Sequence, residues 1–308
     1  MKLCRYGQSG AEKPGLLDRK DQLRDLSSYC SDITAANLAP DGLRRLAAID
    51  PDSVPAVEGN YHFGIPYSGI SKYICIGLNY SDHAAESGLA VPSEPTIFVK
   101  AISALCGPND DTVQPLGSTK LDWEVELGVA IGTKAQYVSE AEALYHVAGD
   151  CLVNDVSERS FQIQWSQWDK GMGCDTFGPI GPWLVTADEI PDPQALPMWL
   201  DVNGRRMQTG NTKTMIFGVN TLVSYVSHYM TLMPGDIIAT STPPGVDMGI
   251  KPEPVFLKLG DTARLGIEGL GEQTQPSSPI CAPRSKLSSS RHDVTGALSR
   301  KSSQARCT

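Results

Sequence analysis

From residue 73 onward, the chain is divided into short β-type runs, each bounded by glycine or proline. These runs are rich in branched and aromatic side chains, and only a few stretches, chiefly 139–144 and 217–229, have helical character. The regular alternation of strands and helices that is typical of a doubly wound sheet is missing. We therefore predict a mixed α/β, β-dominated fold, with strands at 73–77, 96–100, 124–131, 146–155, 198–202, 236–239 and 262–267.

Composition divides the chain into three parts. Residues 1–70 contain short amphipathic pieces at 23–26 and 42–49, which predict a small N-terminal α+β domain. Residues 71–275 carry the strand pattern and are expected to form the main domain. Residues 276–308 are rich in Ser and Arg with little apolar material, so this tail is predicted to be disordered.

Charge and hydropathy exclude several classes of protein. The net charge of −9 disfavours binding to nucleic acid, whose phosphates attract basic surfaces. No stretch approaches the roughly 18 apolar residues of a membrane span, and the N-terminus lacks the apolar run of a signal peptide. The eight cysteines are scattered without any Cys-x-x-Cys pair. We expect a soluble cytoplasmic protein with reduced thiols and with neither a membrane nor a nucleic acid as partner.

Carboxylates stand at alternate positions of one predicted strand. Asp122, Glu124 and Glu126 alternate with apolar residues, so an extended chain places the three carboxylates on one face. Asp155, at the end of the strand 146–155, offers another carboxylate, although such a residue is also common in turns and helix caps. An acidic strand face is often simply solvated. The alternative is a site for Mg²⁺ or Mn²⁺, or for Ca²⁺, because a hard cation removes the repulsion between neighbouring carboxylates.

A histidine and a glutamate stand three residues apart after the first strand. Ser81 and Asp82 predict a helix start, so His83 and Glu86 share one helix face. A carboxylate orients an imidazole and stabilises its protonated form, as a general base acting on water requires. An exposed ion pair is the alternative interpretation.

Further polar residues follow these two groups. Arg159, Gln162 and Lys170 come soon after Asp155 and offer cationic or hydrogen-bonding side chains, although each is also a normal surface residue. Thr242 lies in a Thr/Ser/Pro/Gly turn whose hydroxyls and amides can bind a carboxylate, or can serve the turn itself.

Taken in order, these segments resemble the fumarylacetoacetate hydrolase family over about residues 70 to 272. The matching motifs are Ile76-Gly77-Leu78-Asn79-Tyr80 with His83 and Glu86, Asp122-Trp123-Glu124-Val125-Glu126-Leu127, Asn154-Asp155-Val156-Ser157-Glu158-Arg159, Lys170, Asp175-Thr176-Phe177-Gly178-Pro179-Ile180-Gly181-Pro182, Val202-Asn203-Gly204 and Thr242-Pro243-Pro244-Gly245-Val246. The resemblance implies a β-roll fold, a homodimer and a Mg²⁺- or Mn²⁺-type ion on Glu124, Glu126 and Asp155. It also implies a short lid that carries His83 and Glu86. The overall pattern is most similar to bacterial members that act on acylpyruvates and 2,4-diketo-3-deoxy sugar acids, some of them named ureidoglycolate lyase.

The activity expected from this resemblance is hydrolytic cleavage of a carbon–carbon bond in a small 2-oxo acid, with release of pyruvate. Catalytic roles fall to His83 and Glu86, which would activate water, and to Lys170, which would stabilise the oxyanion. Substrate-binding roles fall to Tyr80, Arg159, Gln162 and Thr242. Ureidoglycolate lyase or oxaloacetate decarboxylase activity on the same metal site is an alternative. A non-enzymatic relative that binds a metal or ligand is a second alternative.

Two positions depart from the family pattern. Ser241 stands where glycine is usual, and a positive φ there would cost roughly 1 kcal/mol. The segment 164–167 lacks the glycine expected before Lys170. Both departures bear on the substrate rather than on the fold.

Overall fold

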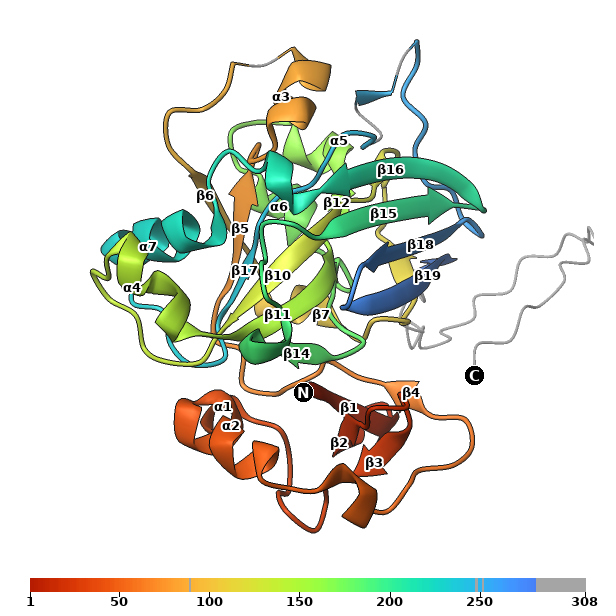
Figure 1. Ribbon diagram of the computed structural model, residues 1–308. Helices are drawn as coiled ribbons and strands as arrows, with labels where there is room; N and C mark the ends of the chain where they lie inside the picture. The colour runs from red at the N-terminus through yellow and green to blue at the C-terminus, as the bar shows by residue number, and fades with distance from the viewer. Residues whose placement is uncertain (89, 247–248, 251, 281–308) are drawn as a thin grey trace, which may run out of the picture.

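A computed structural model describes residues 1–88, 90–246, 249–250 and 252–280 (Figure 1). Its strands are β1 Lys2–Gln8, β2 Ala11–Leu17, β3 Leu23–Asp25, β4 His62–Phe63, β5 Tyr73–Gly77, β6 Thr96–Lys100, β7 Leu105–Cys106, β8 Thr112–Gln114, β9 Leu121–Asp122, β10 Val125–Ile131, β11 Val147–Asn154, β12 Ser157–Glu158, β13 Gly178–Pro179, β14 Leu184–Thr186, β15 Pro197–Val202, β16 Arg205–Asn211, β17 Ile237–Ala239, β18 Thr262–Ile267 and β19 Gly271–Pro279. Its helices are α1 Ala35–Leu38, α2 Pro40–Ala47, α3 Ser81–Ser87, α4 Glu140–Ala143, α5 Arg159–Gln162, α6 Asp169–Met172 and α7 Val219–Tyr229, with short 3₁₀ helices η1 Pro51–Ser53, η2 Ile102–Ala104, η3 Leu144–His146, η4 Ala187–Glu189 and η5 Thr212–Thr214. The predicted β-dominated mixed fold is confirmed, and all seven strands predicted after residue 70 are present.

Two sheets organise the described residues. The larger has ten strands in the order β3-β2-β1-β14-β11-β10-β17-β5-β6, with β4 paired to β1. The smaller has five strands in the order β16-β15-β18-β19-β8. Neighbours in the larger sheet are antiparallel except β17 and β5, which run parallel. The smaller sheet lies to one side of the larger, while α4 and α7 lie together on the other side (Figure 1).

Strand β10 is buried on both faces because a core packs against each of them. Val125, Leu127, Val129 and Ile131 belong to one apolar cluster, and Ala130, on the opposite face, belongs to a second. Alternate side chains of β10 therefore pack on opposite faces of the strand, as the alternating sequence predicts. The acidic face that carries Glu126 is enclosed by protein, so a solvated acidic strand is excluded.

The N-terminal unit contains both strands and helices, as predicted, but it is not a separate sheet. Strand β1 pairs with β14, and the large sheet therefore continues from the N-terminal strands into the main domain. The piece predicted as amphipathic at 23–26 is strand β3, while the piece at 42–49 falls largely in helix α2. Helix α2 begins with Pro40, whose missing N–H costs nothing in the first turn.

The boundary predicted at residue 275 is wrong, because it falls inside β19. That strand continues to Pro279, and Ser277 and Ser278 pair with β8. Alternate residues of β19, including Gln273, Gln275 and Ser277, are buried, so this strand has an inner and an outer face although few of its residues are apolar. The rest of the predicted tail, 281–308, lies outside the described residues.

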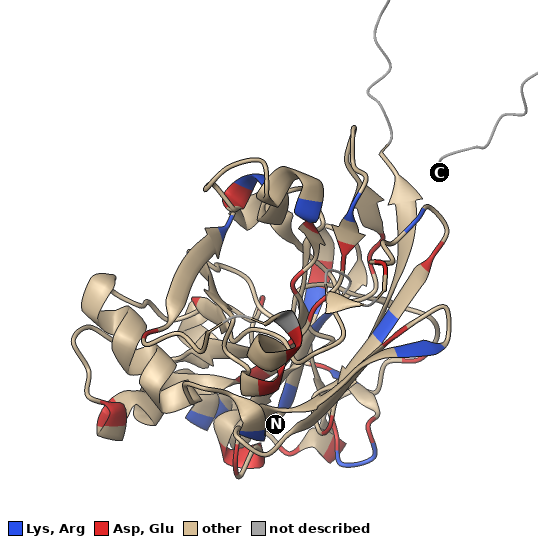
Figure 2. Ribbon diagram, turned by 90° about the horizontal axis from the view of Figure 1, so that it is seen from above, with Lys and Arg blue, Asp and Glu red and all other residues tan. Residues whose placement is uncertain are grey.

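Charged positions of both signs are interspersed over the ribbon (Figure 2). On the smaller sheet they pair: Arg206 contacts Asp201 at 2.5 Å, and Arg264 contacts Glu272 at 2.5 Å. Both guanidinium groups also lie over the ring of Trp199. No helix among the described residues is both long and apolar enough to cross a membrane.

Candidate metal centre

Three buried carboxylates converge where β10 and β11 meet. Ligand oxygens of Glu124, Glu126 and Asp155 lie within 4.8 Å of one another, and this is the only such group of His, Cys, Asp or Glu among the described residues. Glu126 is 1% exposed and Asp155 is fully buried. The structure therefore brings together the three residues that the sequence predicted as metal ligands.

The backbone around Glu124 departs from the predicted continuous strand. Strand β10 begins only at Val125, and the two residues before it are not part of any ladder. Side chains replace the missing ladder partners: Asn154 Oδ1 accepts from the Glu124 N–H at 3.0 Å, and Gln208 Oε1 accepts from the Val125 N–H at 3.0 Å. The Glu124 carbonyl accepts from the Asp155 N–H at 2.9 Å. These bonds fix two of the three ligand-bearing residues to each other.

Two buried cations lie against the carboxylates. Lys100, at the end of β6, contacts Asp155 and donates to the Val156 carbonyl at 2.9 Å. Arg159 bridges Asp122, at 2.7 Å, and Glu124. Among the described residues, four buried carboxylates, those of Asp122 and the three ligands, thus face two buried cations, so negative charge is in excess there. A divalent cation neutralises this charge.

The protonation equilibria of the cluster show the same excess of negative charge. Burial, opposed by Arg159 and reinforced by Asp155 and Asp122, raises the pKa of Glu124 to about 7. Burial and the neighbouring carboxylates of Asp155 and Glu124 raise the pKa of Glu126 well above its ordinary value. The cations among the described residues therefore do not fully compensate the ionised ligands Glu124 and Glu126.

The residues present fit a hard divalent ion. Asp155 Oδ2 is buried and has no hydrogen-bond partner among the described residues, so an oxygen lone pair is left for a ligand. All three donors are carboxylate oxygens, which Mg²⁺ and Mn²⁺ prefer, and three protein ligands leave about three positions of an octahedron for other oxygens.

The predicted histidine–glutamate pair is present on α3. His83 Nδ1 lies 3.4 Å from Glu86 Oε2, and the same oxygen accepts from the Gly245 N–H at 3.1 Å. Gly245 has φ +99°, and a Cβ there would meet the Met207 carbonyl at 2.0 Å, so only glycine fits. Glu86 therefore joins the helix that carries His83 to the loop that follows β17.

The environment of His83 favours a neutral imidazole. Burial lowers the pKa of His83, while Glu86 opposes this by hydrogen bonding and charge. Arg159 and Asp122 also act on the pKa of His83 through their charges, which shows that α3 lies close enough to the cluster for these charges to matter. A neutral ring beside a carboxylate is suited to accept a proton.

Ser241 has the positive φ that its position predicts. Its φ is +76°, in the region that favours glycine. Two hydrogen bonds accompany this conformation: the Ser241 N–H donates to Glu126 Oε2 at 2.9 Å, and Ser241 Oγ accepts from the Asn79 N–H at 3.1 Å. The strained residue thus positions one metal-ligand carboxylate and holds the segment that leads into α3.

Two of the predicted substrate-binding residues have structural partners. Tyr80 is fully buried and its hydroxyl donates to Met198 Sδ at 3.3 Å. The Thr242 hydroxyl donates to the Val125 carbonyl at 2.9 Å and accepts from Gln208 Nε2 at 2.8 Å. Both residues therefore support the walls of the site in this conformation, and their contact with a substrate stays a prediction.

The other predicted residues divide into two groups. Gln162 is buried and accepts from Arg159 Nη1 at 3.0 Å, so it belongs to the cluster. Lys170 is exposed and donates to Gln164 Oε1 at 2.9 Å. Gln164 belongs to the segment 164–167, which lacks the glycine expected before Lys170. The buried cation beside the ligands is Lys100, which sequence reasoning missed. Its only signal was a lysine that closes an otherwise apolar strand.

Comparisons with known proteins assign the chain to a family. Residues 72–276 match the family described as Fumarylacetoacetate (FAA) hydrolase C-terminal. A protein of Burkholderia ambifaria strain AMMD, named "Putative hydrolase", is 60% identical over 276 residues, which are 89% of this chain and 98% of that protein.

Solved structures of the same family superpose over nearly the whole described chain. Fumarylacetoacetate hydrolase from Exiguobacterium antarcticum has a TM-score of 0.82 at 34% identity, covering 91% of this chain and 100% of its own. Maleylpyruvate hydrolase from Sphingobium sp. SYK-6 has a TM-score of 0.75 at 27% identity, with coverage of 91% and 100%. Together with the ordered motifs and the shared fold, these matches show that the chain belongs to the fumarylacetoacetate hydrolase family, a family of enzymes.

Proposed function

We propose that this protein is a divalent-metal-dependent hydrolase that cleaves a 2,4-dioxo acid, an acylpyruvate or a 2,4-diketo-3-deoxy sugar acid, to pyruvate and a second acid. The observation that carries the proposal is the buried cluster of Glu124, Glu126 and Asp155, together with a helix, α3, that carries His83 beside Glu86. One structural neighbour is named a maleylpyruvate hydrolase, and this name supports a substrate built on pyruvate. We extend the proposal to a homodimer that works in the cytoplasm.

Glu124, Glu126 and Asp155 would hold the ion, Mg²⁺ or Mn²⁺, which supplies Lewis acidity toward the carbonyl and carboxylate oxygens of the substrate. His83 accepts a proton from water, and Glu86 stabilises the imidazolium that results. The hydroxide oxygen adds to the 4-carbonyl carbon of the substrate. The bond between C3 and C4 then breaks, C4 leaves as the carboxylic acid, and C3 takes a proton to complete pyruvate.

The cations of the chain act on the negative charge that develops. Arg159 is fixed by Asp122, Glu124 and Gln162, so its guanidinium is already oriented before a substrate binds. Lys100 holds Asp155 in the same way. Lys170 is proposed to contribute to the oxyanion once the loop 164–167 adjusts, since its present partner is only the Gln164 side chain.

The first test is pyruvate release, coupled to lactate dehydrogenase, from a panel of acylpyruvates and 2,4-diketo-3-deoxy sugar acids. We expect turnover with Mg²⁺ or Mn²⁺, none in EDTA, and a loss of about 10²- to 10⁴-fold in kcat for His83→Ala. His228→Ala is the matched control, since His228 is exposed on α7 and bonded to the Ser224 carbonyl. Turnover of oxaloacetate or ureidoglycolate alone would contradict the proposed hydrolysis and would move the activity to the decarboxylase or lyase class.

The pH dependence of kcat gives a second test. Because burial lowers the pKa of His83 from 6.5, the neutral base persists below that pH, and the acid limb of the profile should lie below pH 6.5. Glu86 raises the pKa of His83, so Glu86→Gln should move the acid limb to still lower pH while it lowers kcat. An acid limb that stays in place in Glu86→Gln would show that another group controls it.

A further inference from the structure

A second site lies on β11, away from the carboxylate cluster. Asp150 stands in the middle of this strand, opposite Val129 of β10 and Val185 of β14. Directly opposed residues of neighbouring strands share a face, so the carboxyl group points into the apolar cluster that contains both valines. The residue is 3% exposed.

Asp150 is unusual because no cation among the described residues compensates the charge of its carboxylate. Its Oδ1 is buried and has no hydrogen-bond partner among the described residues. Burial alone raises the pKa of Asp150 to about 7, with no contribution from a nearby cation. Leaving a buried carboxyl unsatisfied is costly, and such a group in a native structure calls for a ligand or a partner.

The carboxyl group borders a cavity of about 390 Å³. The walls come from η3, η4 and the start of α7, and they are mainly apolar, with Leu144, Ile190 and Val219 among them. The other charged lining residue is Asp188, and no Lys, Arg or His lines the cavity. A cavity with apolar walls and two carboxyl groups is suited to a cation with an apolar body.

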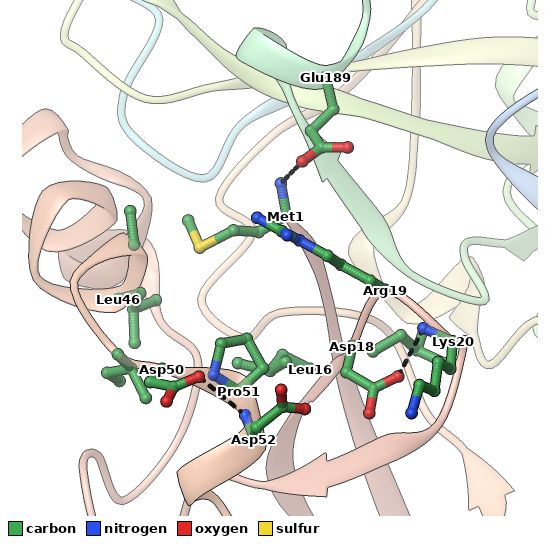
Figure 3. A pocket seen from close by; sticks show the side chains of 13 residues that line it. Met1, Leu16, Asp18, Arg19, Lys20, Leu46, Asp50, Pro51, Asp52 and Glu189 are labelled. Atoms are coloured by element: carbon green, nitrogen blue, oxygen red, sulfur yellow. Dashed lines mark hydrogen bonds and ion pairs between the residues drawn. The ribbon is translucent and has the colours of Figure 1, made fainter.

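A second cavity shows what a compensated carboxylate looks like. It has a volume of about 430 Å³ and lies between the N-terminal unit and η4 (Figure 3). Its buried carboxylate, Asp18, already contacts Arg24 at 2.6 Å, and the Met1 amine lies 3.3 Å from Glu189. Of these two cavities, the one at Asp150 combines an apolar wall with a buried carboxyl oxygen that has no hydrogen-bond partner among the described residues.

We infer that the cavity beside Asp150 is a binding site for a small organic ammonium ion, which donates to the Asp150 carboxylate and packs its carbon chain against the apolar wall. The site is separate from the metal centre, because Asp150 and the ligands lie on different parts of the strand: Asp155 follows the end of β11. Its occupation therefore does not depend on the proposed hydrolase activity.

The inference can be tested with benzylammonium as the probe and benzyl alcohol as its neutral counterpart. Titration calorimetry of the full chain should show saturable binding of benzylammonium and at least roughly tenfold weaker binding of benzyl alcohol. Asp150→Asn should lose roughly tenfold or more in affinity for the cation. Asp188→Asn is the matched control, and it should lose much less because its carboxylate is exposed to solvent.

Crystals of the unmodified protein grown with 4-bromobenzylammonium give a test that does not depend on a variant's folding. The anomalous signal of bromine is expected inside the cavity, with the ammonium nitrogen within hydrogen-bond distance of Asp150. Equal binding of the cation and the alcohol, unchanged affinity in Asp150→Asn, or a cavity that holds only water would each overturn the inference.

Discussion

Replacing Glu126 by Gln should abolish binding of Mn²⁺ and reduce hydrolysis by about three orders of magnitude or more, because a bound ion contributes several kcal/mol to such reactions. Glu126 is buried, and its side chain faces Asp155 and Glu124. An amide of the same shape keeps the packing but removes the charge that a hard cation requires.

The same substitution should stabilise the metal-free protein. Burial and two carboxylates raise the pKa of Glu126 above 4.5, so the folded state binds this proton more tightly than the unfolded state does. Ionisation therefore destabilises the metal-free fold as the pH rises above the unfolded value, and Gln removes that cost. The advantage of the variant in EDTA should grow from acid to neutral pH.

Thermal unfolding in EDTA and in saturating Mn²⁺ measures both effects. The melting temperature of the unmodified protein should rise with Mn²⁺, while that of Glu126→Gln should not. Asp150→Asn is the matched control, since it also removes a buried carboxyl with a raised pKa but lies outside the cluster, and it should keep the Mn²⁺ shift. A Glu126→Gln protein that Mn²⁺ still stabilises would show that the ion binds elsewhere.

Replacing Arg159 by Met should cost roughly 3–5 kcal/mol of unfolding free energy in EDTA, because it removes the buried guanidinium that bridges the carboxylates of Asp122 and Glu124. Methionine retains an apolar stem, so the loss is mainly electrostatic. Arg264→Met provides the comparison: Arg264 also contacts a carboxylate, Glu272, but both side chains are about half exposed. The pair of Arg264 and Glu272 should contribute roughly 1 kcal/mol or less to the free energy of unfolding.

Urea denaturation of the two arginine variants measures this difference. Because the cluster is buried, the ion pairs of Arg159 should contribute several times more unfolding free energy than the exposed pair of Arg264. Similar losses for both variants would mean that water reaches the carboxylates and screens them. Adding Mn²⁺ should restore part of the loss in Arg159→Met, since the ion compensates Glu124.

Much of the main domain could be predicted because its strands are short apolar runs between glycines and prolines. The strands 73–77, 96–100 and 262–267 agree residue for residue with β5, β6 and β18. Strands β1 and β2 were missed, since Lys, Arg and Gln interrupt the first and Pro14 lies within the second. The pairing of β1 with β14 is a long-range property that local patterns do not contain.

The metal ligands could be predicted because alternation places Glu124 and Glu126 on one face, and Asp155 ends the neighbouring strand. The break in the strand before Val125 could not be predicted. It depends on two side-chain partners that are distant in sequence, Asn154 and Gln208.

The burial of two charged residues, Lys100 and Asp150, could also not be predicted from the sequence pattern. Lys100 is buried only because β5 and β6 bring the end of the strand to Asp155, and lysine at a strand end is usually solvated. Asp150 lies within an apolar strand, where the sequence shows neither its burial nor the cavity beside it.

Product analysis in water enriched with ¹⁸O tests the proposed reaction most directly. With 2,4-dioxopentanoate and Mn²⁺, we predict equal amounts of pyruvate and acetate, with one oxygen from water incorporated into the acetate, and no reaction in EDTA or in Glu126→Gln. Consumption of the substrate without acetate, acetate that lacks the label, or turnover that survives removal of the metal would contradict metal-dependent hydrolysis of the carbon–carbon bond.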